Sequence, residues 1–286
     1  MVLMVFIDGL GVGENDPRRN PLAACPDLWP TRGRSPSHPG LHYKPLDACL
    51  GVAGLPQSAT GQTALLTGLN APKLLGKHLQ GFPSKPLIEI LHKHSIFLHL
   101  TRRGLRGTFA NAYRHPEDIT PASRLSVTSH ALKASGQPFR SLEQLRQKEA
   151  LFHDFTSRQL IQRGYSAPEF TPEEAADILV TLAQAHDFTL YEHFLTDVLA
   201  HHSSAAEIAA HVDLLSRFIR AILARVEKTR ISLVITSDHG NIEDSRVRTH
   251  TRNPVPLLWT GKIVACRDSP PDDIAGVAPW VLKLLR

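Results

Sequence analysis

The sequence of 286 residues has no apolar run that approaches the length of a membrane-spanning helix, which needs about 18 such residues. The apolar segment 1–7 lacks the basic residues and the cleavage site of a signal peptide, so we interpret it as a buried first strand. Cysteine is also scarce. Cys25, Cys49 and Cys266 are odd in number, far apart and without CxxC spacing, which argues against a disulfide framework or a thiolate zinc site. We therefore expect a cytoplasmic protein without a membrane partner.

Clustered positive charge is missing as well. The formal net charge is +5 and the pI is near 9.2, but Lys and Arg are scattered and the densest run, at 102–106, is short. A nucleic-acid binder usually concentrates its basic residues on one face. We expect no nucleic-acid partner, whereas basic residues near a cleft would suit a small phosphorylated substrate. The sequence leaves the oligomeric state open.

Length and an apolar content of 42% are typical of one large globular α/β domain or two small ones. Residues 2–7 are continuously apolar and end in Asp-Gly, which predicts a central parallel strand covered on both faces. Further strands are predicted at 95–100, 107–110, 187–194, 231–236 and 256–260, and helices at 61–75, 86–94, 141–150, 171–185, 205–228 and 274–285. This alternation predicts an α/β fold with a doubly wound, mostly parallel sheet.

Two other segments complete the predicted organisation. Residues 14–50 are rich in Pro, Arg and Gly and are expected to be mostly irregular, and residues 114–168 are polar and interrupted by Pro. We interpret 114–168 as a small insertion or cap, and 1–113 with 169–286 as the core. At residue 171, Thr-Pro-Glu-Glu is a clear helix start, because Thr is a good N-cap, Pro suits the first position and Glu174 completes a capping box.

Residues 237–241, Ser-Asp-His-Gly-Asn, form the most informative motif. Asp238 and His239 come directly after a predicted buried strand, where open α/β sheets gather their ligands. His250 follows 11 residues after His239, just before Asn253 and Pro254. Most of the 16 histidines would be surface or capping residues, but a carboxylate and two imidazoles in this setting favour a metal site.

Asp197 and His201 supply a second pair of ligand types. They are four residues apart, so on a helical turn both side chains lie on one face and can share an ion. Such spacing often occurs by chance, and the pair is weak evidence alone. Its position directly after a predicted strand strengthens it.

Asp8 ends the first predicted strand. The following run, Gly-Leu-Gly-Val-Gly at 9–13, could be taken for a dinucleotide-binding loop. Residues 14–17 would break the helix that such a loop requires, and the Asp8 carboxylate would repel a pyrophosphate. A carboxylate at this position suits a cation better.

Residues 54–63 place three hydroxyls, those of Ser58, Thr60 and Thr63, next to a predicted helix start. Free N–H groups and the helix dipole stabilise a phosphate there, although such a residue often only caps its helix. A hydroxyl is a poor nucleophile at neutral pH unless a base or a metal lowers its pKa. The metal ligands elsewhere make this loop a candidate phosphate acceptor.

In this order, the motifs at 7–9, 54–63, 197–201, 238–241 and 250–256 (His-Thr-Arg-Asn-Pro-Val-Pro) resemble the alkaline phosphatase superfamily. They resemble in particular its metalloenzyme branch, which holds cofactor-independent phosphoglycerate mutase and phosphopentomutase. The resemblance covers roughly residues 1–75 and 187–286. It implies an alkaline phosphatase-like fold and a metal-dependent phosphoryl-transfer enzyme.

The resemblance also implies roles for single residues. One divalent ion would be held by Asp8, Thr63, Asp238 and His239, and a second by Asp197, His201 and His250. Thr63 would be the nucleophile, because it follows Gly61-Gln62 as the family's Ser or Thr follows its Gly-x pair. Mixed Asp and His ligation suits Mn or Zn, and carboxylate-rich sites also accept Mg. Asn241, Glu243 and Asn253 are expected to support the ligands.

The segment 114–168 is much shorter than the substrate domain of the mutases, which supplies basic residues that retain the substrate. Four arginines could serve here: Arg114, Arg124, Arg140 and Arg158. A smaller lid favours release and hydrolysis, so we expect a phosphohydrolase of small phosphate esters with a phospho-threonine intermediate. The alternatives are a mutase of phosphoglycerate or pentose phosphate, and a non-catalytic metal-binding descendant.

Overall fold

The computed structural model describes residues 1–120, 123–260 and 269–285; Cys266 lies outside them. Its main sheet has the strand order β2-β8-β7-β1-β6-β3. These strands are β1 (Val2–Ile7), β2 (Leu41–Leu46), β3 (Gly107–Phe109), β6 (Phe188–His193), β7 (Ser232–Thr236) and β8 (Val255–Thr260). A small second sheet pairs β4 (Ala112–Tyr113) with β5 (Arg140–Ser141).

β1 lies in the middle of the sheet and runs parallel to both of its neighbours, β6 and β7. β3 is parallel to β6, whereas β8 is antiparallel to β7 and to β2. The predicted α/β fold with a mostly parallel sheet is thus confirmed. Because β1, β6 and β7 are parallel, the chain leaves all three at the same edge of the sheet.

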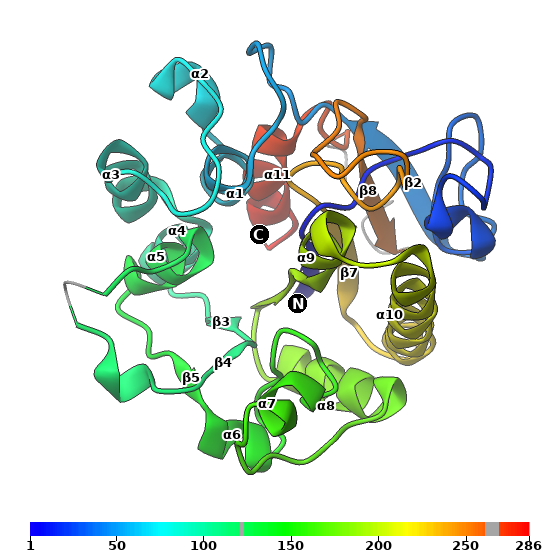
Figure 1. Ribbon diagram of the computed structural model, residues 1–286. Coiled ribbons are helices and arrows are strands. Elements are labelled where there is room, and N and C mark those ends of the chain that lie inside the picture. Colours follow the sequence, from blue (N-terminus) through cyan, green and yellow to red (C-terminus); the bar gives the residue numbers. More distant parts are fainter. Residues whose placement is uncertain (121–122, 261–268, 286) are drawn as a thin grey trace.

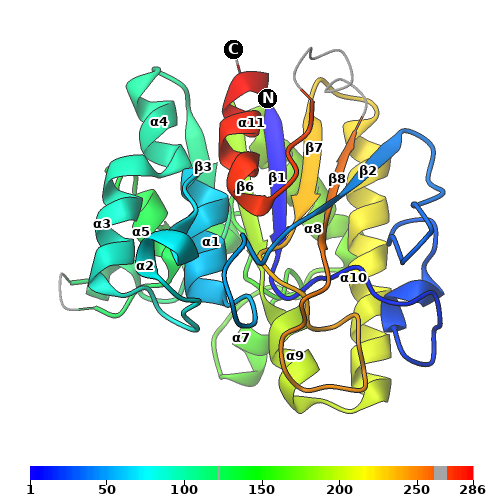
Figure 2. The same cartoon turned by 90° about the horizontal axis from the view of Figure 1, so that it is seen from above.

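Helices cover both faces of the sheet (Figure 1). On one side lie α1 (Ser58–Thr67), α3 (Lys85–His94), α4 (Ile96–Arg102) and α11 (Val277–Leu284), and on the other α8 (Pro172–Gln184) and α10 (Ala205–Val226), as Figure 2 shows. Alternate residues of β1 enter the two cores: Leu3, Val5 and Ile7 pack in one, and Val2, Met4 and Phe6 in the other. Such complete burial explains why this strand is apolar at every position.

The shorter helices are α2 (Ala71–Leu75), α5 (Val127–Lys133), α6 (Leu142–Arg146), α7 (Arg158–Gln162) and α9 (Leu195–His202), with 3₁₀ turns at Pro21–Ala24, Pro116–Asp118 and Ile274–Gly276. Residues of the segment 114–168 enter both cores. Leu145 and Phe155 pack in the core that contains Leu3, and Val127 and Leu132 in the other. The division into a core and an insertion stays a prediction.

The structure corrects three sequence-based expectations. Residues 95–100 form helix α4 instead of a strand, because the Ser95 hydroxyl accepts the N–H of Leu98 and apolar residues 96, 97 and 100 are buried on one side. The segment 14–50, expected to be irregular, contains β2. The single helix predicted at 61–75 is divided into α1 and α2 by Gly68, which has a φ of 79°.

The predicted capping box at Thr171 is confirmed. The Thr171 hydroxyl accepts the N–H of Glu174, and the Glu174 carboxylate accepts the N–H of Thr171. Within the described residues, no helix is both long and apolar enough to cross a membrane.

Candidate metal centre

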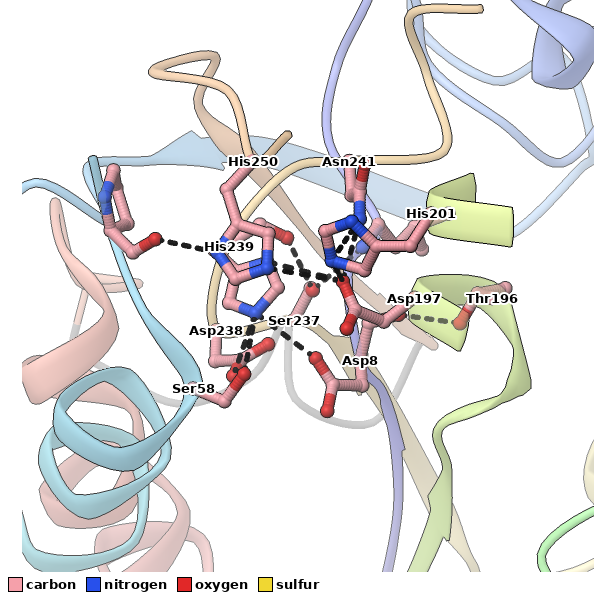
Figure 3. A network of polar contacts seen from close by, with 12 residues as sticks. Asp8, Ser58, Thr196, Asp197, His201, Ser237, Asp238, His239, Asn241 and His250 are labelled. Atoms are coloured by element: carbon pink, nitrogen blue, oxygen red, sulfur yellow. Dashed lines mark hydrogen bonds and ion pairs between the residues drawn. The ribbon is translucent and has the colours of Figure 1, made fainter. Parts of the chain in front are cut away.

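The candidate site lies where three neighbouring parallel strands end. Asp8 follows β1, Asp238 and His239 follow β7, and α9 begins directly after β6 with Asp197 and His201. β1 lies between β6 and β7, so these chain segments leave the sheet side by side. Figure 3 shows their side chains converging.

The first group of metal-ligand types contains Asp8, Asp238 and His239, with one donor atom of each within 4.8 Å of the others. His239 Nε2 lies 3.2 Å from Asp8 Oδ1 and 3.6 Å from Asp238 Oδ2. All three residues are buried. Among the described residues, Asp8 Oδ1, both carboxylate oxygens of Asp238 and His239 Nδ1 have no hydrogen-bond partner. Buried carboxylates are costly without a counter-charge, so this group fits a cation.

The second group contains Asp197, His239 and His250. Asp197 Oδ1 lies 3.4 Å from His250 Nε2 and 3.5 Å from His201 Nε2. The Nδ1–H of His201 donates to the carbonyl of Arg248 at 2.6 Å, and that of His250 to the carbonyl of Pro56 at 2.9 Å. These bonds leave both Nε2 atoms facing Asp197, an arrangement typical of metal-binding histidines.

Charge within the site is strongly coupled. Burial raises the pKa of Asp238, and the negative charge of Asp8 raises it further. Burial alone would lower the pKa of His239, but Asp238 and Asp8 outweigh it and raise that pKa to about 10. Burial also opposes ionisation of Asp197, yet the hydrogen bond from His250 and the charge of His239 lower its pKa. The carboxylates of Asp8, Asp197 and Asp238 therefore stabilise a positive charge that lies between them.

Glu243 connects the loops that carry these residues. Its buried carboxylate accepts hydrogen bonds from the N–H groups of Gly11 at 3.1 Å and Asn241 at 2.7 Å, from Asn253 Nδ2 at 2.9 Å, and from the Thr251 hydroxyl. A Cβ atom on Gly11 would lie 2.3 Å from the Glu243 carboxylate. This close approach explains why residue 11 is a glycine, so the glycine run at 9–13 does not require a bound dinucleotide.

Two amide side chains orient the carboxylates. Asn241 Nδ2 donates to Asp197 Oδ1 at 2.7 Å and lies 3.1 Å from His201 Nε2. Gln62 Nε2 donates to Asp8 Oδ2 at 3.0 Å. The sequence predicts this supporting role for Asn241 but not for Gln62. The only indication for Gln62 is that it follows Ser58 by one helical turn.

Thr63 does not lie in either ligand group. It is fully buried inside α1, where its hydroxyl donates to the carbonyl of Ala59 at 2.6 Å. Ser58 is the first residue of α1, and its Oγ lies 3.0 Å from His239 Nε2. The sequence predicts a helix start at Gly61, but α1 begins three residues earlier, at Ser58. With this earlier start, Thr63 lies in the buried interior of the helix. Thr63 as metal ligand and nucleophile stays a prediction, which its burial and its bond to the Ala59 carbonyl do not favour, and Ser58 is the better-placed candidate.

A cavity of about 380 Å³ opens beside the site, with Ser58, Asp197, His201 and His250 in its wall. Three of the six Asp and His residues predicted as ligands, Asp197, His201 and His250, therefore line this cavity. Their role as ligands stays a prediction.

Comparison with known proteins relates part of the chain to a family. A model described as Metalloenzyme superfamily matches residues 152–286. Over these residues, a little under half of its length, the chain is similar to this superfamily. It is 33% identical over 128 residues to a 2,3-bisphosphoglycerate-independent phosphoglycerate mutase of Desulforudis audaxviator, and 26% identical over 124 residues to one of Mycoplasmopsis synoviae. Each match covers 41% of this chain and 24% of the relative, so the chain spans about a quarter of the length of these curated relatives.

Solved structures show the same fold. The PH0037 protein of Pyrococcus horikoshii has a TM-score of 0.57 and 13% identity over 99% of this chain and 96% of that one. A cold-active alkaline phosphatase of Shewanella has a TM-score of 0.57 and 11% identity over the whole of both chains. The predicted resemblance to alkaline phosphatase-like metalloenzymes is confirmed.

Proposed function

We propose that the chain is a metal-dependent phosphohydrolase of small phosphate esters, with Ser58 as the residue that is transiently phosphorylated. Asp8, Asp238, His239 and Ser58 would hold one divalent ion, and Asp197, His201 and His250 a second, with Mn or Zn as the best-suited metals. The observation that carries the proposal is the position of Ser58 Oγ, 3.0 Å from His239 Nε2 at the edge of the first ligand group. The site of the phosphoryl group is then the mouth of the 380 Å³ cavity.

Ser58 has the surroundings that a phosphate acceptor requires. It begins α1, a helix of 10 residues whose N-terminus has no side-chain cap among the described residues. The N–H groups and the positive end of the dipole at such a terminus stabilise phosphoryl oxygens. Divalent ions, when bound, neutralise the phosphoryl oxygens and lower the pKa of a coordinated hydroxyl.

The residues then support a two-step reaction. Ser58 Oγ forms a bond to phosphorus as the ester bond breaks, and the alcohol is released. Water next attacks the phosphoserine, which releases inorganic phosphate and restores the hydroxyl. Gln62 and Asn241 hold Asp8 and Asp197 in place through both steps.

A mutase is the second candidate, because the matched curated relatives are phosphoglycerate mutases. A mutase must keep its intermediate while the substrate turns over. We favour hydrolysis because the segment 114–168 is short and the cavity above Ser58 is open to solvent.

The test is an ester-hydrolysis assay with added Mn or Zn, run beside an assay for interconversion of 2- and 3-phosphoglycerate. The Ser58→Ala variant should lose about 10³-fold or more in kcat, whereas Thr63→Val, which removes the other candidate hydroxyl from the same helix, should retain most of it. Mass spectrometry of protein quenched during turnover should find phosphate on Ser58. Phosphate on Thr63 would refute the assignment, and interconversion would favour the mutase. A protein without bound metal or turnover would favour the non-catalytic alternative.

A further inference from the structure

A second cavity, of about 240 Å³, is lined by residues of the segment 114–168 and by the end of β6. Its wall includes Glu192 and Phe194, the residues on either side of His193 at the end of β6. The carbonyl of His193 accepts the N–H of Asp8 at 2.9 Å. The cavity and the first ligand group therefore share the end of β6.

Aromatic rings line much of this cavity: Phe109, Tyr113, Phe152, His153 and Phe194. The His153 ring packs between Phe152 and Phe194, with both pairs of ring centroids 4.1 Å apart. A cavity walled by aromatic rings favours a flat, apolar body over an extended polar chain. Its volume suits a single ring better than a nucleotide.

Two arginines, Arg114 and Arg163, line the same cavity and are exposed to solvent. Neither forms an ion pair with a carboxylate in the part of the chain that the structure describes. By contrast, Arg158 and Arg146 in the same segment pair with Glu169 and Glu143. Arg114 lies over the Tyr165 ring, and Arg163 donates to the Gln159 side chain at 3.4 Å. Two guanidinium groups that are not neutralised by a carboxylate are well suited to bind the carboxylate of a ligand.

A carboxyl group also lies in the wall of this cavity. Glu192 is only 7% exposed and accepts a hydrogen bond from the Thr128 hydroxyl at 2.7 Å. Asn111 fixes its backbone, donating to the Glu192 carbonyl at 2.7 Å and accepting its N–H at 2.9 Å. When it is ionised, Glu192 repels an anion, so a negatively charged group of a ligand is favoured beside Arg114 and Arg163.

We propose that this cavity binds the organic part of the substrate, and that this part is a single flat ring bearing a carboxylate that pairs with Arg114 and Arg163. The inference rests on the proposed function for the position of the phosphoryl group at Ser58. Of the four arginines suggested by the sequence, it retains Arg114. Arg124, Arg140 and Arg158 are not among the residues that line this cavity. Arg163 was not anticipated.

Binding of a ligand without phosphate tests the cavity apart from catalysis. The probe is 4-hydroxybenzoate, titrated into the purified chain by calorimetry beside its neutral analogue 4-hydroxybenzamide. We expect the anion to bind about tenfold more tightly than the amide, and the double variant Arg114→Ala/Arg163→Ala to lose that preference. The exposed Arg146→Ala variant is the matched control and should keep it. Equal affinities for both probes in the unsubstituted protein would overturn the proposal.

The Asp238→Asn variant separates this cavity from the metal ligands. It should bind 4-hydroxybenzoate as the unsubstituted protein does, and loss of binding would mean that the carboxylate sits on the metal centre instead. In turnover, 4-carboxyphenyl phosphate should show a kcat/KM about tenfold above phenyl phosphate. The double arginine variant should abolish this difference by lowering kcat/KM for 4-carboxyphenyl phosphate far more than for phenyl phosphate. Binding without hydrolysis of any ester would refute only the proposed function. Hydrolysis without either preference would refute only the cavity assignment.

Discussion

Replacement of Asp238 by Asn should stabilise the folded protein in the absence of metal and destabilise it, relative to the unsubstituted protein, when metal is bound. Asp238 is fully buried, and neither of its oxygens has a hydrogen-bond partner among the described residues. In a chelator, the variant removes a buried carboxylate with a raised pKa, but it leaves a buried amide that is also unsatisfied. The difference should stabilise the folded state by about 1–2 kcal/mol.

With metal present the order should reverse. A ligand that binds only the folded state at 100 times its Kd stabilises it by about 2.7 kcal/mol, and the variant lacks one ligand oxygen. At about 2–4 °C per kcal/mol for a chain of this size, Mn should raise the Tm of the unsubstituted protein by about 5–10 °C. The variant should respond little.

The pH dependence gives a second check on the same residue. An acid whose pKa is raised on folding keeps its proton in the folded state after the unfolded chain has lost it, so the free energy of unfolding falls as pH rises above about 4. In chelator, the advantage of Asp238→Asn should therefore be larger at pH 8 than at pH 5.

The assay is thermal unfolding followed by circular dichroism in EDTA and in Mn. The control is Asp244→Asn, which removes a carboxylate of the same loop that pairs with Arg246 at 2.7 Å outside the site; its metal response should match the unsubstituted protein. An Asp238→Asn variant that is less stable than the unsubstituted protein in EDTA would refute the reasoning, because the carboxylate would then be stabilising without an ion.

Three further predictions concern positions around the site. Burial raises the pKa of Glu192 to about 7, so its ionisation lowers the stability of the metal-free protein as pH rises from about 4.5 to 7. The Glu192→Gln variant should therefore be more stable than the unsubstituted protein by up to about 3 kcal/mol at pH 8 and by little at pH 4.5. Urea unfolding measures this difference, and an equal gain at both pH values would contradict the prediction. Gly11→Ala should cost about 1–3 kcal/mol because its Cβ would overlap the Glu243 carboxylate, and an unchanged urea midpoint would show that the loop can move aside. Thr171→Ala should lose about 1 kcal/mol with the capping box, seen as a lower Tm that Thr171→Ser restores.

The sequence was sufficient to predict that the Asp and His residues of the site lie together, because parallel strands bring their ends together whatever the intervening chain does. Asp8, Asp197 and Asp238 each follow a buried strand by one to four residues, so their meeting follows from the topology alone. The choice between Ser58 and Thr63 depended instead on where α1 begins. A shift of a few residues in a helix start turns a side chain from the site into the core, and hydroxyl spacing does not determine that start.

Other features depended on tertiary contacts that no local pattern reveals. Residues 95–100 combine a good N-cap with an apolar run too short to distinguish a helix from a strand, and packing of Phe97 and Leu100 in the core decides for the helix. Arg163 reaches the same cavity as Arg114 only because the segment between them folds back. Nothing in the sequence near residue 163 indicates that meeting.

The buried carboxylate of Glu243 also restricts how this site can be altered. A Cβ atom on Gly11 would lie 2.3 Å from it, whereas a Cβ atom on Gly240 would meet both this carboxylate and the Thr251 hydroxyl. Shortening Glu243 would make room at Gly11 and at the same time release the N–H groups of Gly11 and Asn241. Positions 11, 240 and 243 are therefore interdependent. A variant library that changes them one at a time would miss combinations of substitutions that still hold Asp8 beside Asp238.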